Sequence, residues 1–186
     1  MKRSDFNILL FLGLYFLMKE GFYFYVGLIS PGGKLFSPFL TRFANFPYWL
    51  SALVSGSARL LLTIMGYAVY QKSATNITIT GSSGVNIAWG CLGVGAISLW
   101  IAFIIAHRWA IKNKVKWVVA GVVFIFIVNI MRIAMIALSN YYGWKYMHSF
   151  NAHTSFDVLT YAVILILMLF FTLQYNRQKN KVITLH

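Results

Sequence analysis

The sequence WVVAGVVFIFIVNIMRIAMIAL, residues 117–138, decides the fold class, because its only charged side chain is Arg132. About 20 mostly apolar residues are enough for a helix to cross the roughly 30 Å hydrocarbon core of a bilayer. Residues 87–106 and 156–173 have the same character. Residues 6–28 are also long enough, although Lys19 and Glu20 interrupt them. These four stretches predict a multi-pass membrane protein.

The composition supports a membrane protein and excludes several other classes. The chain has 186 residues, of which 60% are hydrophobic and only 10% charged, and Cys91 is its one cysteine. A soluble domain has about a quarter of its residues charged. Disordered chains and disulfide-stapled domains are excluded as well. The net charge of +13 comes from Lys and Arg at the ends of the apolar stretches, which indicates membrane topology and argues against nucleic-acid binding.

The basic residues predict how the chain is oriented. Lys and Arg gather in the loop 107–116 and in the C-terminal tail, and by the positive-inside rule both face the cytoplasm. If the N-terminal Lys2 and Arg3 are cytoplasmic too, the number of spans is even. We therefore expect four spans, with five as the alternative. The basic residues of the loop and the tail are Arg108, Lys112, Lys114, Lys116, Arg177, Lys179 and Lys181.

Residues 49–70 form the ambiguous segment. Its polar residues recur every four positions, which places them on one helical face. Such a helix either lies in the membrane interface or crosses the membrane facing the bundle, and the even span count favours packing on the outer face. The polar residues are Ser51, Ser55, Arg59 and Thr63.

Residues 77–80 and 85–88 are short β-prone runs on either side of the turn at 81–84, and they predict a β-hairpin on the outer side. The expected fold class is therefore an all-α membrane protein. It is a multi-pass helical bundle of about four spans, possibly five, with a small outer-face β-hairpin, forming one domain over residues 1–186.

Three chemically capable side chains are expected in the outer layer, each on a different helix. Cys91 lies about one turn inside its span, between Gly90 and Gly93. Arg132 lies about 22 Å along its helix from the cytoplasmic side. His153 comes just before the last span, with His148 as a competing histidine. Each residue also has a purely structural interpretation. Cys91 would be an inert buried thiol, Arg132 would extend to the lipid headgroups, and His153 would belong to the polar start of a helix.

Together the three residue types suit acyl transfer. A histidine activates a thiol and later protonates a leaving amine, and an arginine stabilises a thiolate or an oxyanion. Asp157, four residues after His153, would orient the imidazole. A separate hypothesis pairs Glu20 with Arg59 or Arg132, and it gives the adjacent Lys19 a different partner.

The motifs Trp89-Gly-Cys91-Leu-Gly93 after a hairpin, Asn129-Ile-Met-Arg132-Ile, and His153 before an apolar helix resemble the exosortase/archaeosortase family. The resemblance covers residues 49–171 and is strongest to the short single-domain bacterial members. It implies a membrane cysteine protease and transpeptidase with Cys91 as nucleophile, assisted by Arg132 and His153. Leu92 departs from the residues that many members carry after the nucleophile.

The resemblance also implies substrates and a location. Family members cleave C-terminal sorting signals, made of a short motif, a transmembrane helix and a basic tail, through a Cys thioester on the outer face of the cytoplasmic membrane. The expected partners are such substrate proteins and the lipid bilayer, without nucleic acid, metal or organic cofactor. The alternative is a catalytically silent membrane protein that binds such helices or assists export and surface anchoring.

Overall fold

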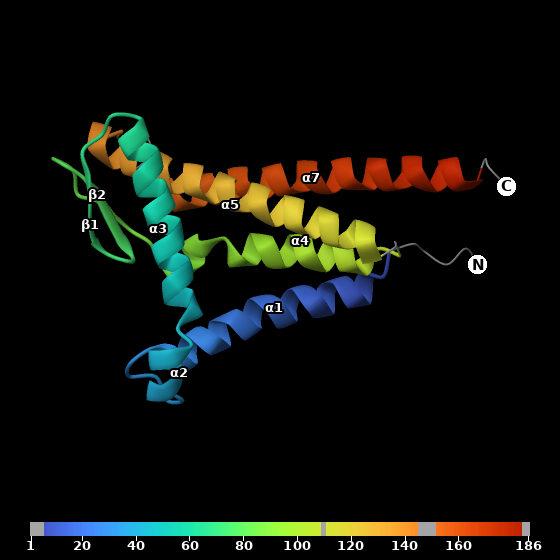
Figure 1. Cartoon of the computed structure of the whole chain (residues 1–186), viewed down its shortest axis with the longest axis horizontal. Helices are drawn as coiled ribbons and strands as arrows, with labels where there is room; N and C mark the ends of the chain where they lie inside the picture. Colours follow the sequence, from blue (N-terminus) through green and yellow to red (C-terminus); the bar gives the residue numbers. More distant parts are fainter. Residues whose placement is uncertain (1–5, 109–110, 145–151, 184–186) are drawn as a thin grey trace.

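The computed structural model describes residues 6–108, 111–144 and 152–183, and for 111–112, 152–157 and 178–183 it describes the backbone alone. Four helices run side by side along the long axis of the molecule (Figure 1). The two chain ends lie at one end of this bundle, and a small sheet lies at the other (Figure 1). The four helices are α1 (Ile8–Ile29), α4 (Val94–Ala106), α5 (Ile111–Tyr142) and α7 (Ala152–Ile183).

Three of the described helices are long and apolar enough to cross a membrane, over Ile8–Ile29, Asn113–Tyr142 and Val158–Arg177. They correspond to the expected spans 6–28, 117–138 and 156–173. The chain is thus a mostly helical membrane protein. Helix α4, with 13 residues, is about 20 Å long and shorter than the hydrocarbon core. The total of four spans therefore stays a prediction.

The expected continuous helix over residues 87–106 is wrong for its first part. The chain leaves the sheet at β3 (Val85–Asn86) and makes the short 3₁₀ helix η1 (Trp89–Leu92) before α4 begins. The amide of Ile87 donates to the carbonyl oxygen of Thr75 at 2.6 Å, so this residue is still held by the loop between the first two strands. Gly93 has a φ of +74°, a conformation that glycine adopts without steric cost, and it separates η1 from α4.

The ambiguous segment 49–70 divides into two elements. Helix α3 (Phe46–Ile64) crosses the sheet end of the bundle at a steep angle to the long helices, next to the short α2 (Pro38–Phe43) (Figure 1). Tyr70 does not belong to this helix, because it lies in strand β1 (Val69–Ser73). Of the two expectations for this segment, the transverse position of α3 agrees with packing on one end of the bundle and not with a crossing parallel to the long helices.

The polar stripe of α3 faces the sheet. Ser51 is buried and its Oγ donates to the carbonyl oxygen of Ala74 at 3.1 Å. Ser55 is also buried, and its Oγ accepts a hydrogen bond from Nε2 of Gln71 in β1 at 2.8 Å. The four-residue spacing thus predicted the shared face correctly, and its buried half is bound to Gln71 in β1 and to Ala74 in the turn that follows β1.

The sheet has three antiparallel strands in the order β1, β2 (Asn76–Ile79), β3. Strands β2 and β3 pair around the turn at 81–84, with Ile77 opposite Val85. Strand β1 was missed by the sequence analysis. The carboxamide of Asn140 on α5 donates to the carbonyl oxygen of Gly84 at 2.8 Å and ties the turn to the bundle.

The hypothesis that Glu20 pairs with Arg59 or Arg132 is wrong. Its Oε1 lies 3.5 Å from Nζ of Lys19, the adjacent residue in α1. The two side chains are 62% and 33% exposed, so the long lysine stem bends back to its neighbour at the helix surface. Such an exposed pair contributes little to stability.

Two apolar clusters hold the helices together. One lies where α3, the sheet, η1 and α5 meet, and the other joins α4, α5 and α7. In the second cluster Trp100 is almost fully buried, and its Nε1 donates to the carbonyl oxygen of Trp117 at 3.1 Å. The indole ring of Trp100 occupies the space that a side chain at Gly121 would need.

We predict that Gly121→Ala destabilises the protein. The added Cβ would overlap with the Trp100 indole ring, and because Trp100 is packed on all sides, α4 and α5 would have to separate. Overpacking of this kind costs about 1–3 kcal/mol. Thermal unfolding in detergent should show a lower Tm for this variant. The control is Gly13→Ala in α1, where nothing lies within 4 Å of the added Cβ; equal Tm values for both variants would contradict the prediction.

Candidate functional site

Asn129 and Arg132 lie on one face of α5, because three residues make nearly one helical turn. Both side chains are buried, with exposed fractions of 1% and 6%. Nδ2 of Asn129 donates to the backbone carbonyl oxygen of Cys91 at 2.8 Å, across 38 positions of sequence. Nη1 of Arg132 lies 3.5 Å from Oδ1 of Asn129, a long hydrogen bond. One carboxamide therefore contacts both the loop of the cysteine and the arginine.

The thiol of Cys91 lies in the η1 turn and is buried, with 4% of the residue exposed. The amide of Cys91 donates to the carbonyl oxygen of Ala88 at 2.8 Å, which closes the turn. Gly93 packs directly on the Asn129 side chain, since a Cβ at Gly93 would come within 3.4 Å of Asn129 Cγ. The absence of a side chain at Gly93 thus lets the loop approach α5 closely enough for the hydrogen bond.

Burial of the Arg132 guanidinium is energetically expensive. Translocon scales assign about 2.5–3.5 kcal/mol to an arginine at the centre of a membrane helix. Hydrogen bonding to a polar side chain offsets part of this cost. The Asn129 carboxamide is well suited to this role, because its oxygen accepts from the arginine while its NH₂ group donates to Cys91.

His153 lies in the first turn of α7, which begins at Ala152. Its side chain and that of Asp157 are outside the described residues, as is the whole of His148. Helix α7 passes close to the first turn of α4, because a Cβ at Gly95 would come within 3.3 Å of the Tyr161 hydroxyl. Position 153 is about 12 Å further along α7, towards its N-terminal end. Cys91 and Arg132 are therefore joined through Asn129, and of His153 only the backbone position is known.

Asn129 is the residue to which the sequence analysis gave no role. It was part of the Asn-x-x-Arg motif, yet its chemistry was not considered. The three-residue spacing from Arg132 was the available signal, because it puts a donor and acceptor beside a buried charge. The contact with Cys91 required the fold.

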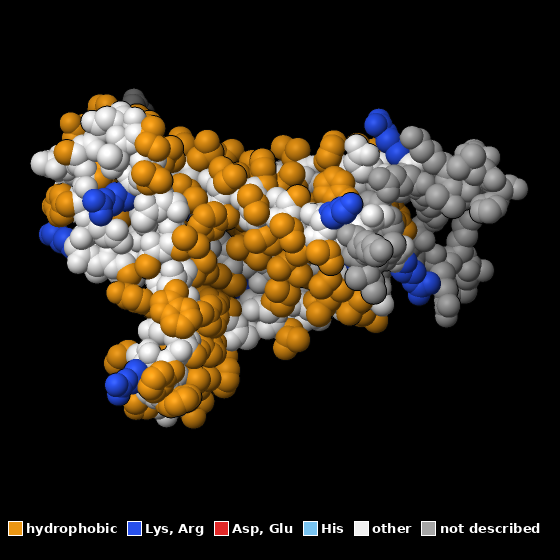
Figure 2. Space-filling model, viewed as in Figure 1, with side chains coloured by type: hydrophobic (Ala, Val, Ile, Leu, Met, Phe, Trp, Pro, Cys, Tyr) orange, Lys and Arg blue, Asp and Glu red, His pale blue; other side chains and the backbone are white. Residues whose placement is uncertain are grey.

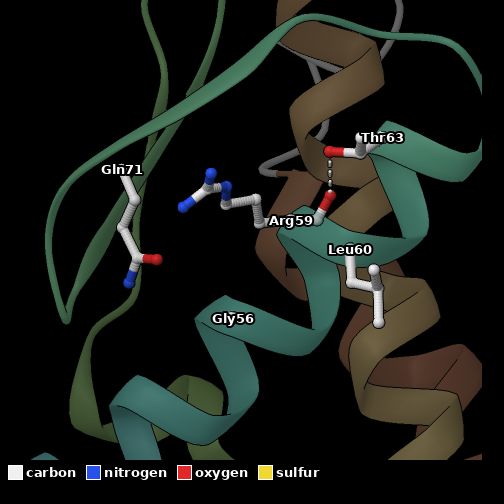
Figure 3. Close-up of a pocket in the computed structure, with 5 residues that line it drawn as sticks. All are labelled: Gly56, Arg59, Leu60, Thr63 and Gln71. Atoms are coloured by element: carbon white, nitrogen blue, oxygen red, sulfur yellow. Dashed lines mark hydrogen bonds between the residues drawn. The ribbon is translucent and has the colours of Figure 1, made fainter.

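Two cavities lie near the sheet end of the bundle. One of about 440 Å³ lies between α1, α3 and α4 and is mostly apolar, with Phe22, Phe46 and Ile97 among its lining residues. The other, of about 300 Å³, lies between α3 and β1 and is lined by Gly56, Arg59, Leu60, Thr63 and Gln71 (Figure 3). Within the described residues, no group of three His, Cys, Asp or Glu side chains is placed to hold a metal ion.

We predict that Asn129→Ala loosens the cysteine loop. The change leaves the buried carbonyl of Cys91 without its donor, which costs about 1–3 kcal/mol. The Cys91 thiol should then react faster with a small thiol reagent such as methyl methanethiosulfonate, and the Tm should fall.

Asn140→Ala is the matched control. It removes a carboxamide bond of the same length from the same helix, but to Gly84 instead of Cys91. Its Cys91 thiol should react at the wild-type rate. If both variants changed the reaction rate of the Cys91 thiol equally, the prediction that Asn129 specifically restrains the cysteine loop would be wrong.

A model of one known family matches most of the chain. The model of the transmembrane exosortase family (Exosortase_EpsH) matches residues 8–170, which include Cys91, Arg132 and His153. No curated protein and no solved structure matches the chain. The matched region runs from the first helix into α7 and covers most of the sequence. The chain therefore belongs to the transmembrane exosortase family.

Proposed function

We propose that this protein is a membrane cysteine protease and transpeptidase that cleaves C-terminal sorting signals through a thioester on Cys91. Membership of the exosortase family supports the processing of sorting signals in general. The single observation that carries the specific proposal is the Asn129 carboxamide, which contacts both the Cys91 loop and the buried Arg132. A cation near a cysteine favours the thiolate, and Asn129 connects the buried Arg132 to the Cys91 loop.

In the proposed reaction, the Cys91 sulfur attacks the scissile carbonyl carbon and the thiol proton passes to the His153 imidazole. Arg132 stabilises the negative charge on the carbonyl oxygen of the tetrahedral intermediate. The C–N bond then breaks, and the imidazolium returns the proton to the leaving amine, which departs with the C-terminal helix and tail. Attack on the thioester by water or by an acceptor amine releases the thiol again.

Asn129 acts as a positioning residue in this proposal. It holds the Cys91 carbonyl, and so it fixes the η1 turn and the direction in which the thiol leaves the backbone. Precise placement of a nucleophile is worth several kcal/mol of barrier. Gly93, whose backbone has a positive φ, also helps to position the thiol, because it allows the η1 turn to lie against α5.

We propose that the site faces outward from the bacterial cytoplasmic membrane. Hydrophobic side chains cover the middle of the molecule, and Lys and Arg lie towards its ends (Figure 2). The end with both termini also carries Arg108, which follows α4, and the lysines at the start of α5, Lys112, Lys114 and Lys116. By the positive-inside rule that end is cytoplasmic, which puts η1 and the sheet on the other side.

The burial of Cys91 favours the second candidate function, a silent partner that binds sorting-signal helices. A thiol with so little exposed surface does not meet a substrate carbonyl unless the η1 turn or α3 moves. The two candidates therefore differ in whether tail removal depends on the thiol.

Co-expression with a reporter protein that ends in an apolar helix and a basic tail distinguishes them. We expect Cys91→Ser and Arg132→Ala to lose tail removal, and His153→Ala to slow it by about 100-fold or more, as expected for the loss of a general base. An immunoblot of a C-terminal tag measures the cleavage. His148→Ala is the control and should cleave normally. Normal cleavage by Cys91→Ser would favour the silent partner.

The topology is tested with introduced cysteines in a Cys91→Ser background. Ser83 is exposed in the turn between β2 and β3, and Val115 is 56% exposed near the start of α5. A membrane-impermeant maleimide should label Ser83→Cys in intact spheroplasts and Val115→Cys only after permeabilisation. The opposite pattern would reverse the orientation of the site.

A further inference from the structure

The cavity between α3 and β1 has a cationic wall. In Figure 3 the Arg59 side chain extends from α3 towards Gln71 on β1, and Leu60 points away from both. The lining residues include no carboxylate, and within the described residues no ion pair involves Arg59. Nε2 of Gln71 donates a hydrogen bond to Ser55, which holds the amide in place with its oxygen on the side of Arg59 (Figure 3). The cavity thus presents the N–H donors and the positive charge of the Arg59 guanidinium.

The same helix carries an exposed apolar stripe. Trp49, Leu53, Leu60 and Ile64 are 57%, 57%, 62% and 74% exposed, and their spacing places them on one helical face. The opposite face of α3 is buried against the sheet and α5. A helix with one buried face would leave a large apolar surface in water unless the stripe meets lipid.

The position of α3 agrees with contact to lipid. It crosses near the sheet end of the bundle (Figure 1), where a helix with one apolar face suits the membrane interface. Arg59 directly precedes Leu60 and lies at the edge of the apolar stripe. A long basic side chain in this place extends its charge to the headgroup layer while its stem stays among apolar groups.

We propose that the cavity binds the phosphate of a membrane phospholipid, with the Arg59 guanidinium as the donor. The acyl chains of this lipid lie along the apolar stripe of α3. A phosphodiester is an anion that matches the guanidinium in charge and geometry. Free phosphate has no apolar part and would leave the stripe uncovered. The bound lipid fixes α3, which packs directly on η1.

Lipid retention by the purified full-length protein tests this proposal. The protein in a neutral detergent is titrated with dioleoylphosphatidylglycerol, and bound lipid is counted by native mass spectrometry. We expect one retained lipid per wild-type chain and an affinity at least about tenfold lower for Arg59→Gln, because a charge-assisted contact is lost. Arg59→Lys should keep part of the affinity through its charge.

Arg42→Gln is the matched control, since Arg42 is exposed on α2 and lies over the Phe43 ring, outside the cavity. It should bind lipid as the wild type does. Dioleoylglycerol, which has the same chains and no phosphate, should not be retained. The lipid-free Tm of Arg59→Gln should equal that of the wild type, because the side chain is exposed. If the Tm of Arg59→Gln is lower, Arg59→Lys becomes the test variant. Its lipid affinity must then lie between that of the wild type and that of Arg59→Gln.

Three results would overturn the proposal. Equal lipid affinity of the wild type and Arg59→Gln would remove the role of the cavity. Displacement of the lipid by inorganic phosphate at the same concentration would make the cavity a site for free anions. Loss of reporter cleavage in Arg59→Gln with unchanged lipid binding would assign the cavity to the substrate protein.

Discussion

The hydrogen bond from the Asn129 carboxamide to the Cys91 carbonyl oxygen is the contact on which the sheet end of this protein depends. It connects the middle of α5 to a loop 38 positions earlier in the chain. Eleven residues, or about three turns, further along α5, Asn140 holds the carbonyl of Gly84 in the same way. Helix α5 therefore carries two carboxamides on one face that anchor the cysteine loop and the hairpin turn.

The other end of the bundle combines a cluster of aromatic rings with hydrogen bonds to the end of α4, such as the one from the Lys114 ammonium to the carbonyl oxygen of Ile105 at 2.9 Å. The ring of His107 packs against Phe6, Phe103, Phe171 and Tyr175, and its Nδ1 lies 2.9 Å from the carbonyl oxygen of Phe103. These rings join the N-terminal segment, α4 and α7. The two ends thus differ in their side chains: aromatic rings cluster at the end with the termini, and asparagine carboxamides hold backbone carbonyls at the end with the cysteine.

The shortness of α4 gives the cysteine loop its position. Because α4 has only 13 residues, the preceding segment is free to form a 3₁₀ turn and a strand within the same layer as the end of α5. A helix that continued from residue 87 would have put the Cys91 carbonyl into a helical hydrogen bond, and Asn129 would have had no acceptor there. The loss of regular helix is thus what makes the carbonyl available, at the cost of backbone groups that need other partners.

The sequence by itself determined the membrane class, three helices that are long and apolar enough to span the membrane, and the pairing of β2 with β3. These features are local, since transfer free energy and helical period depend on segments of about 20 residues. The role of His153 stays a prediction. Only the tertiary structure decided where α4 begins, that the serines of α3 face a strand, that Glu20 pairs with Lys19, and that Asn129 meets Cys91. The partner of a buried hydrogen bond is chosen by the packing of distant segments, and no local pattern records that choice.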